Sequence, residues 1–168
     1  MTRIFSALAI ALLLSGCATS DGGVDEAAFQ MNASADDAHC QSLLMRPGDL
    51  VYAQCRLALR KTYLNDYAAR KKVIEAKYGP IDHALDLALR NDAFCNYDQS
   101  TQMVLKQMSD QAVAEAAYGN CSDRRNELDA EFTKAKGVPG ETLNAMERPM
   151  IIRQNIQAVQ EAKDVING

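Results

Sequence analysis

Four cysteines placed symmetrically about two turn signals constrain the fold of this chain most strongly. The chain has 168 residues and five cysteines, and four of these lie beyond residue 33, namely Cys40, Cys55, Cys95 and Cys121. The midpoint of the first two falls within 46–49, Arg-Pro-Gly-Asp, and the midpoint of the last two falls within 107–110, Gln-Met-Ser-Asp. Four cysteines allow three pairings. Because two cysteines equidistant from a turn face each other across an antiparallel helix hairpin, the spacing predicts Cys40–Cys55 and Cys95–Cys121.

The N-terminus predicts that these cysteines meet an oxidising compartment. A charged start with Arg3 precedes an apolar stretch over 4–14, the small residues Ser15 and Gly16, and then Cys17. This plan is typical of a secretory signal peptide. The stretch is well short of the about 20 residues that a helix needs to cross a bilayer. We therefore expect residues 1–16 to be a removed signal peptide and the exported chain to form disulfides.

The residues Leu14-Ser15-Gly16-Cys17 resemble the bacterial lipobox. The resemblance implies that Cys17 is lipidated, becoming the first residue of the mature chain and carrying diacylglycerol and an N-acyl chain. No other cofactor is expected. The alternative is an ordinary signal peptide followed by an incidental cysteine. By analogy with lipoprotein sorting, Ala18 rather than Asp after the lipidated residue implies the outer membrane, at its periplasmic face, with the inner membrane as the alternative.

Composition predicts one domain behind a tether. Residues 17–33 are mostly small and polar, which is typical of a flexible tether after the acylated cysteine. Residues 34–168 have the length of a single domain. The formal net charge is −4, and removal of Arg3 makes the mature chain more acidic. This balance argues against nucleic acid as a partner, so we expect the membrane to be contacted through the lipid anchor.

Helical periodicity runs through the predicted domain, without sustained alternation typical of strands. Helices are expected over 34–47, 50–78, 81–108, 110–136 and 142–166. The pair Asn91-Asp92 could interrupt the third, and Pro149 is expected to kink or restart the last. The predicted fold is an all-α, disulfide-braced bundle of about four to five helices with antiparallel hairpins.

Two faces of the longest expected helix have distinct chemistry. Alternating steps of three and four from Leu50 to Tyr78 are mostly apolar, which predicts the buried seam. A second face gathers basic and tyrosine side chains, and it is a candidate interaction strip for anionic headgroups, cell-wall carboxylates or an acidic partner. The alternative is a solvated face that covers the bundle edge. The residues of this strip are Arg56, Arg60, Tyr63, Tyr67, Arg70, Lys71 and Lys77.

Residues 36–59 resemble a module found in small alphaproteobacterial lipoproteins of unknown function, with the pattern Cys-x-Ser, Pro-Gly, then Tyr-x-x-Cys-Arg. Within the segment from Asp36 to Leu59, the residues that carry the pattern are Cys40, Ser42, Pro47, Gly48, Tyr52, Cys55 and Arg56. Leu44 departs from the pattern, which has glycine there, so we expect a more helical turn before Pro47. The resemblance supports the Cys40–Cys55 disulfide and implies no activity.

No motif for catalysis, phosphate binding or haem attachment occurs in the chain. His39 and His83 lie apart from any close cysteine pair, so no metal site is expected. We predict no catalytic residues, no enzyme activity and no small-molecule substrate. The leading hypothesis is a structural or protein-interaction lipoprotein with a protein partner in the envelope. The alternative is an inhibitor of a lysozyme-like cell-wall hydrolase, which would use the short loops at 47–49 or 137–140.

Overall fold

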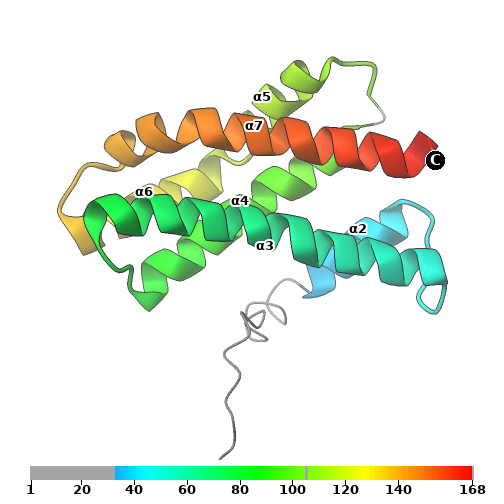
Figure 1. The fold of residues 1–168 in the computed structure, drawn as a ribbon, viewed down its shortest axis with the longest axis horizontal. Helices are drawn as coiled ribbons and strands as arrows, with labels where there is room; N and C mark the ends of the chain where they lie inside the picture. Colours follow the sequence, from blue (N-terminus) through cyan, green and yellow to red (C-terminus); the bar gives the residue numbers. More distant parts are fainter. Residues whose placement is uncertain (1–32, 105, 168) are drawn as a thin grey trace, which may run out of the picture.

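This computed structural model describes residues 33–104 and 106–167, which contain six helices joined by turns and loops and no strand (Figure 1). The prediction of an all-α bundle is therefore confirmed. The expected signal peptide, Cys17 and the tether up to residue 32 lie outside the described residues. The helices are α2 (Ala33–Ser42), α3 (Leu50–Tyr78), α4 (His83–Gln102), α5 (Asp110–Asn120), α6 (Ser122–Lys136) and α7 (Gly140–Asn167).

Local chemistry sets the ends of α3 and the start of α4. Asp49 takes the N-cap position of α3 in an extended conformation, although its side chain makes no capping hydrogen bond. At the other end Gly79 has φ 77°, and its N–H donates to the Glu75 carbonyl. Glycine suits this position because it has no Cβ to clash. The Asp82 carboxylate then accepts a hydrogen bond from the Leu85 N–H and starts α4, which is not interrupted at residues 91–92.

The single helix expected over 110–136 is divided at Cys121. Ser109 caps α5 as expected, with its side chain accepting from the Ala112 N–H, but α5 ends at Asn120 and α6 begins at Ser122. Gly119 and Asn120 are poor helix formers. The adjacent cysteine is also tied to α4 by a disulfide. Both features favour a change of helix direction here, which raises the number of helices above the predicted four to five.

The interruption expected at Pro149 does not occur, because α7 continues through it. Proline cannot donate the usual hydrogen bond to the carbonyl of Ala145. Ala145 and Pro149 are both exposed, so water can donate a hydrogen bond to the Ala145 carbonyl. Buried neighbours such as Ile151 and Ile152 hold the opposite side of the helix against the bundle.

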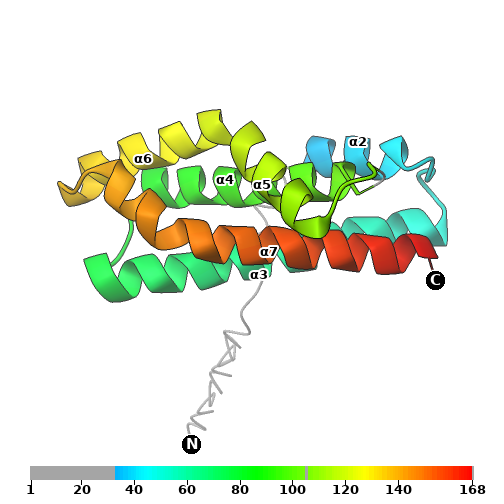
Figure 2. The ribbon, with the colours of Figure 1, turned by 90° about the horizontal axis from the view of Figure 1, so that it is seen from above.

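Helix α4 is the centre of the packing, with contacts to α3, α5, α6 and α7. The long helices α3 and α7 both follow the long axis of the molecule (Figures 1 and 2). Three apolar clusters fill the interior, centred on Phe132, Tyr63 and Val113. No described helix has the length and apolar character needed for a membrane span.

Both predicted disulfides are present. Cys40 of α2 is bonded to Cys55 of α3, with Cα atoms 6.0 Å apart. Cys95 of α4 is bonded to Cys121 at the α5–α6 junction, with Cα atoms 5.8 Å apart. The first closes the α2–α3 hairpin, and the second fixes the break between α5 and α6 to the central helix.

Candidate functional site

The interaction strip that was expected to be exposed on α3 is partly buried in the core. Tyr63, Tyr67 and Arg70 have exposed fractions of only 1%, 7% and 1%. The expectation that these three lie on a surface is therefore wrong, and for these three so is the alternative of a solvated face. The buried face of α3 passes through Leu59 and Ile74 as well, so it includes the centre of the strip. Packing of α3 against α4 and α7 at this face removes these three side chains from solvent.

The other residues of the strip do not form a continuous exposed surface. Arg56 and Lys71 are partly buried and form ion pairs with aspartates of α2 and α4. Lys77 is exposed, and the Arg60 side chain lies outside what the structure describes. The prediction of a buried apolar seam is also wrong at its first residue, because Leu50 is 73% exposed.

The interior contains a three-residue ion-pair network at Arg70. The guanidinium of Arg70 donates through Nε and Nη2 to the two carboxylate oxygens of Glu147, both at 3.0 Å. Its Nη1 lies 2.7 Å from Oδ2 of Asp92. Each side chain is at most 1% exposed. The network therefore joins α3, α4 and α7 by charge in the centre of the bundle.

Charge and burial act in opposite directions on Arg70. Burial lowers the pKa of the guanidinium, but the charges of Glu147 and Asp92 outweigh it and hold that pKa above its ordinary value. The cation is thus stabilised by two carboxylates in a fork-shaped geometry that arginine provides and lysine does not. A network of this kind can fix which helix faces meet.

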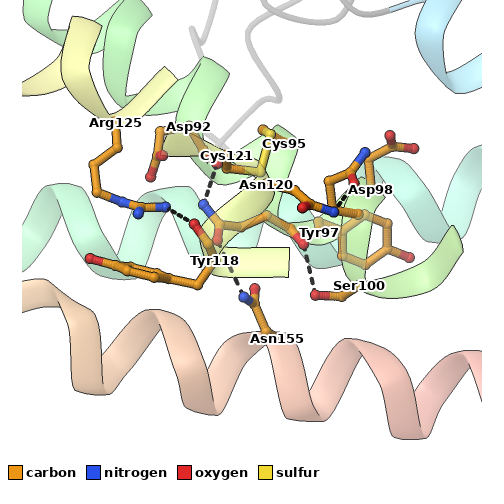
Figure 3. The surroundings of a disulfide bond; sticks show 12 residues. Asp92, Cys95, Tyr97, Asp98, Ser100, Tyr118, Asn120, Cys121, Arg125 and Asn155 are labelled. Carbon is orange, nitrogen blue, oxygen red and sulfur yellow. Dashed lines mark hydrogen bonds between the residues drawn. A yellow bond between two sulfur atoms is a disulfide. The ribbon is translucent and has the colours of Figure 1, made fainter. Parts of the chain in front are cut away.

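A line of polar residues continues this network along the buried face of α4. Asn96 donates through Nδ2 to the Asp92 carbonyl at 2.8 Å, and the Ser100 hydroxyl donates to the Asn96 carbonyl at 2.8 Å. Asn155 of α7 donates through Nδ2 to Asn96 Oδ1 and to the Ala114 carbonyl of α5, both at 3.2 Å (Figure 3). One buried amide therefore links three helices.

The Cys95–Cys121 disulfide lies beside this polar line (Figure 3). Arg125, one turn after the helix break, donates to the Tyr118 carbonyl one turn before it. The Arg125 guanidinium carbon also lies 3.3 Å from the centre of the Tyr118 ring. These contacts cross the α5–α6 junction and hold its angle.

His39 belongs to the α2–α4 interface rather than to a metal site. Its Nδ1 lies 3.2 Å from Asp98 Oδ1, and its Nε2 lies 3.5 Å from the Thr101 hydroxyl. The side chain is 5% exposed. Among the residues that the structure describes, no group of three or more potential metal-binding His, Cys, Asp or Glu side chains comes together.

Two carboxylates approach each other between α3 and α7. The pKa of Asp66 is raised to about 7, mainly by burial and then by the charge of Glu161, against the opposing charge of Arg70. The Thr62 hydroxyl donates to Glu161 Oε2 at 3.2 Å. Burial, then the charges of Glu161 and Asp66, also raise the pKa of the Tyr97 hydroxyl. Both shifts arise mainly from burial at a helix interface, and the neighbouring acidic charges add to it.

A shallow depression between α6 and α7 is lined in part by the carboxylate of Asp129. Burial raises the pKa of Asp129, whereas a hydrogen bond from Asn144 lowers it. A Cβ added at Gly140 would lie 2.4 Å from the Asp129 Cβ, so only glycine allows this approach. The partner of the carboxylate is an amide, and the contact serves to seat the start of α7 on α6.

Sequence reasoning missed the polar interior because it treated charge as a surface feature. The buried polar side chains hold the helices in register through contacts with one another. Their hydrogen bonds are made inside the bundle. The chain matches no protein-family model. Searches of curated proteins and of solved structures likewise find no match.

Proposed function

We propose that this chain is a lipid-anchored envelope lipoprotein that acts as a structural or protein-interaction module at the periplasmic face of the outer membrane. One observation carries the proposal. The cysteines of the helical domain pair with one another, in the combinations Cys40–Cys55 and Cys95–Cys121. This leaves Cys17 as the fifth cysteine, directly after Leu14-Ser15-Gly16.

The disulfides support an extracytoplasmic location for the domain. Such bonds persist in oxidising compartments and are rare where thiols are kept reduced. The acyl chains proposed on Cys17 would supply the membrane affinity, since each buried methylene contributes about 0.8 kcal/mol. On this proposal the remainder of the chain is presented to the periplasm.

The interior supports a binding or structural role over catalysis. Arg70, Asp92 and Glu147 neutralise one another in the core, and Asn155 is used to join three helices. These groups stabilise the relative positions of the helices. A rigid domain of this kind can present its outer surface to another envelope protein at low entropic cost.

Lipidation is tested by labelling cells with a palmitate analogue. Wild-type protein is expected to be labelled, whereas Cys17→Ser is expected to lose the label. Equal labelling of the two proteins, or none in wild type, would contradict the anchor.

The interaction role is tested by crosslinking in the native envelope followed by identification of the attached protein. A reproducible protein adduct that is lost on Cys17→Ser is the expected result. Recovery of the protein alone across crosslinkers of different length would contradict a partner-binding role.

A further inference from the structure

We propose that the tip of the α2–α3 hairpin, residues 43–51, docks on the lipid bilayer and sets the orientation of the bundle above it. We call this segment the hairpin tip. The inference rests on the proposed lipid anchor, which would hold the domain beside a membrane. It adds a second membrane contact made by the protein's own side chains.

Large apolar side chains are concentrated on the hairpin tip. Leu44, Leu50 and Val51 have exposed fractions of 91%, 73% and 51%. Elsewhere in the described chain, the large apolar side chains classed as exposed are Val73 and Met108, each at 38%. Single exposed apolar residues are common on proteins, but a group of them at one site indicates a binding surface.

The backbone at Leu44 adds an independent observation. Its φ is 63°, the only positive φ at a non-glycine residue in the described chain. This left-handed region favours glycine, and leucine there is strained. The expectation of a more helical turn is wrong, because α2 ends at Ser42. Because the Leu44 side chain is exposed, packing in the core does not account for a leucine at this strained position. Contact of the side chain with an apolar partner outside the protein would account for it.

The hairpin tip is braced against collapse onto the bundle. The Cys40–Cys55 disulfide lies at its base. The Met45 N–H donates to the Cys40 carbonyl at 3.3 Å, and the hydroxyl of Tyr52 donates to Asp37 across the hairpin. These contacts hold the apolar side chains outward instead of allowing them to fold back.

The position of the hairpin tip fits a chain anchored at Cys17. Residues 17–32 separate the proposed anchor from α2, and a segment of that length spans at most about 55 Å. The ten residues of α2 then add about 15 Å to the tip. The bilayer that receives the acyl chains is therefore within reach of Leu44. The exposed Arg46 also lies in the tip, where it can meet lipid phosphates.

The shape of the hairpin tip favours a bilayer over a protein partner or a second copy of this chain. The hairpin connection lies at one end of the molecule, next to the end of α7 (Figures 1 and 2). Three side chains on a narrow end offer far less than the about 800 Å² that each partner contributes to a standard protein interface. A few apolar side chains are enough to insert into the boundary between headgroups and acyl chains.

The test uses the full-length protein in its native envelope with photoactivatable fatty acids incorporated into the cell's lipids. After illumination, lipid adducts are mapped to peptides by mass spectrometry. We expect adducts on the peptide that contains 43–51 and none above background on the peptide that contains Val73. Leu50→Glu should lower the tip adduct at least about fivefold, because it removes an inserted apolar group. The matched variant Val73→Glu should leave it unchanged.

Leu50 is exposed at the first turn of α3, where an acidic residue suits the helix dipole, so Leu50→Glu should fold. Leu44→Gly is a second variant that keeps the backbone and removes the side chain, and it should also lower the adduct. Equal adducts at the tip and at Val73 would overturn the inference. So would protein adducts at the tip, from another protein or a second copy, in a parallel sample treated with a conventional crosslinker.

The mass of the Cys17 peptide from the same sample separates the two proposals. An acylated Cys17 with no lipid adduct at the hairpin tip overturns the docking inference alone. A Cys17 without acyl chains overturns the proposed function and the docking inference with it.

Discussion

Two regions of the molecule depart from the usual arrangement, in which charged side chains are exposed and apolar side chains are buried. One is the interior around Arg70, and the other is the hairpin tip. At Arg70 three charged side chains are buried to 1% exposure or less. At the hairpin tip, Leu44 and Leu50 are the most exposed of the large apolar side chains described. Both regions are reached from α3, which begins at the tip and passes through the ion-pair network. The same helix therefore places polar groups inside and apolar groups outside.

This contrast shows what helical periodicity reports and what it omits. The period predicted that α3 is a helix, because that depends on the backbone. It did not reveal that the buried face holds a charged side chain, because such a side chain is accommodated inside only when its partners on other helices are present. Experiments that disturb the two regions separately measure what each contributes.

The largest effect is expected at the ion-pair network. Arg70→Met leaves two buried carboxylates without their cation and should lower the free energy of unfolding by about 3–5 kcal/mol. Urea denaturation with the disulfides intact measures it. Arg124→Ala is the control, because it breaks a pair with side chains 52% and 53% exposed and should change stability by under about 1 kcal/mol. Similar losses for the two variants would contradict the central role of Arg70.

The disulfides should differ in the region that they affect. Replacing both cysteines of Cys95–Cys121 with serine should cost about 3.5 kcal/mol from loop entropy, against about 3 kcal/mol for Cys40–Cys55. Loss of the first should loosen the α4–α5–α6 contacts, and loss of the second should loosen the hairpin tip. Amide hydrogen exchange by mass spectrometry reports both. Equal deprotection across the whole bundle in either variant would contradict this local division.

A smaller effect is expected at Asp66, on the edge of the polar interior. Burial and Glu161 raise its pKa from the ordinary 3.8 to about 7, so the folded state retains this proton more tightly than the unfolded state. Its contribution to stability is therefore greatest below about pH 4 and falls as the pH rises towards about 7.

Asp66→Asn should accordingly stabilise the protein at pH 8, by about 1 kcal/mol or more, and have little effect at pH 4. Urea unfolding at the two pH values measures it. The exposed Asp164→Asn serves as the control. A loss of stability at pH 8 in Asp66→Asn would show that the carboxylate, and not the proton, is favoured at this site.

The smallest effect is expected at the hairpin tip. Leu44→Gly relieves about 1–2 kcal/mol of left-handed strain and adds about 0.5–1 kcal/mol of unfolded-chain entropy, for a net gain of about 0.5 kcal/mol. Thermal unfolding should therefore occur at a slightly higher temperature. A lower Tm would mean that the Leu44 side chain stabilises the fold, against its 91% exposure.

Much of the fold follows from short-range features of the sequence. The bounds of α3, Leu50–Tyr78, were predicted from turn residues at each end. The disulfide pairs were predicted from the distance of each cysteine to a turn. The break at Cys121 and the continuity through Pro149 were not, because neighbouring helices and solvent exposure decide them.

The polar interior could have been predicted only in part. Arg70 falls at the three-to-four spacing of Tyr63, Tyr67 and Ile74, so its place on a buried face had a signal in the sequence. Its partner Glu147 is 77 residues away, and local pattern carries no information on that pairing. The exposure of Leu50 had no signal either, since it depends on the end of the bundle at which α3 begins.

The most direct test of the account is non-reducing peptide mass mapping of the mature protein isolated from envelopes. We expect an N-terminal Cys17 carrying diacylglycerol and an N-acyl chain, together with linked peptides for Cys40–Cys55 and Cys95–Cys121. An unmodified Cys17, or free thiols at the other four cysteines, would contradict it.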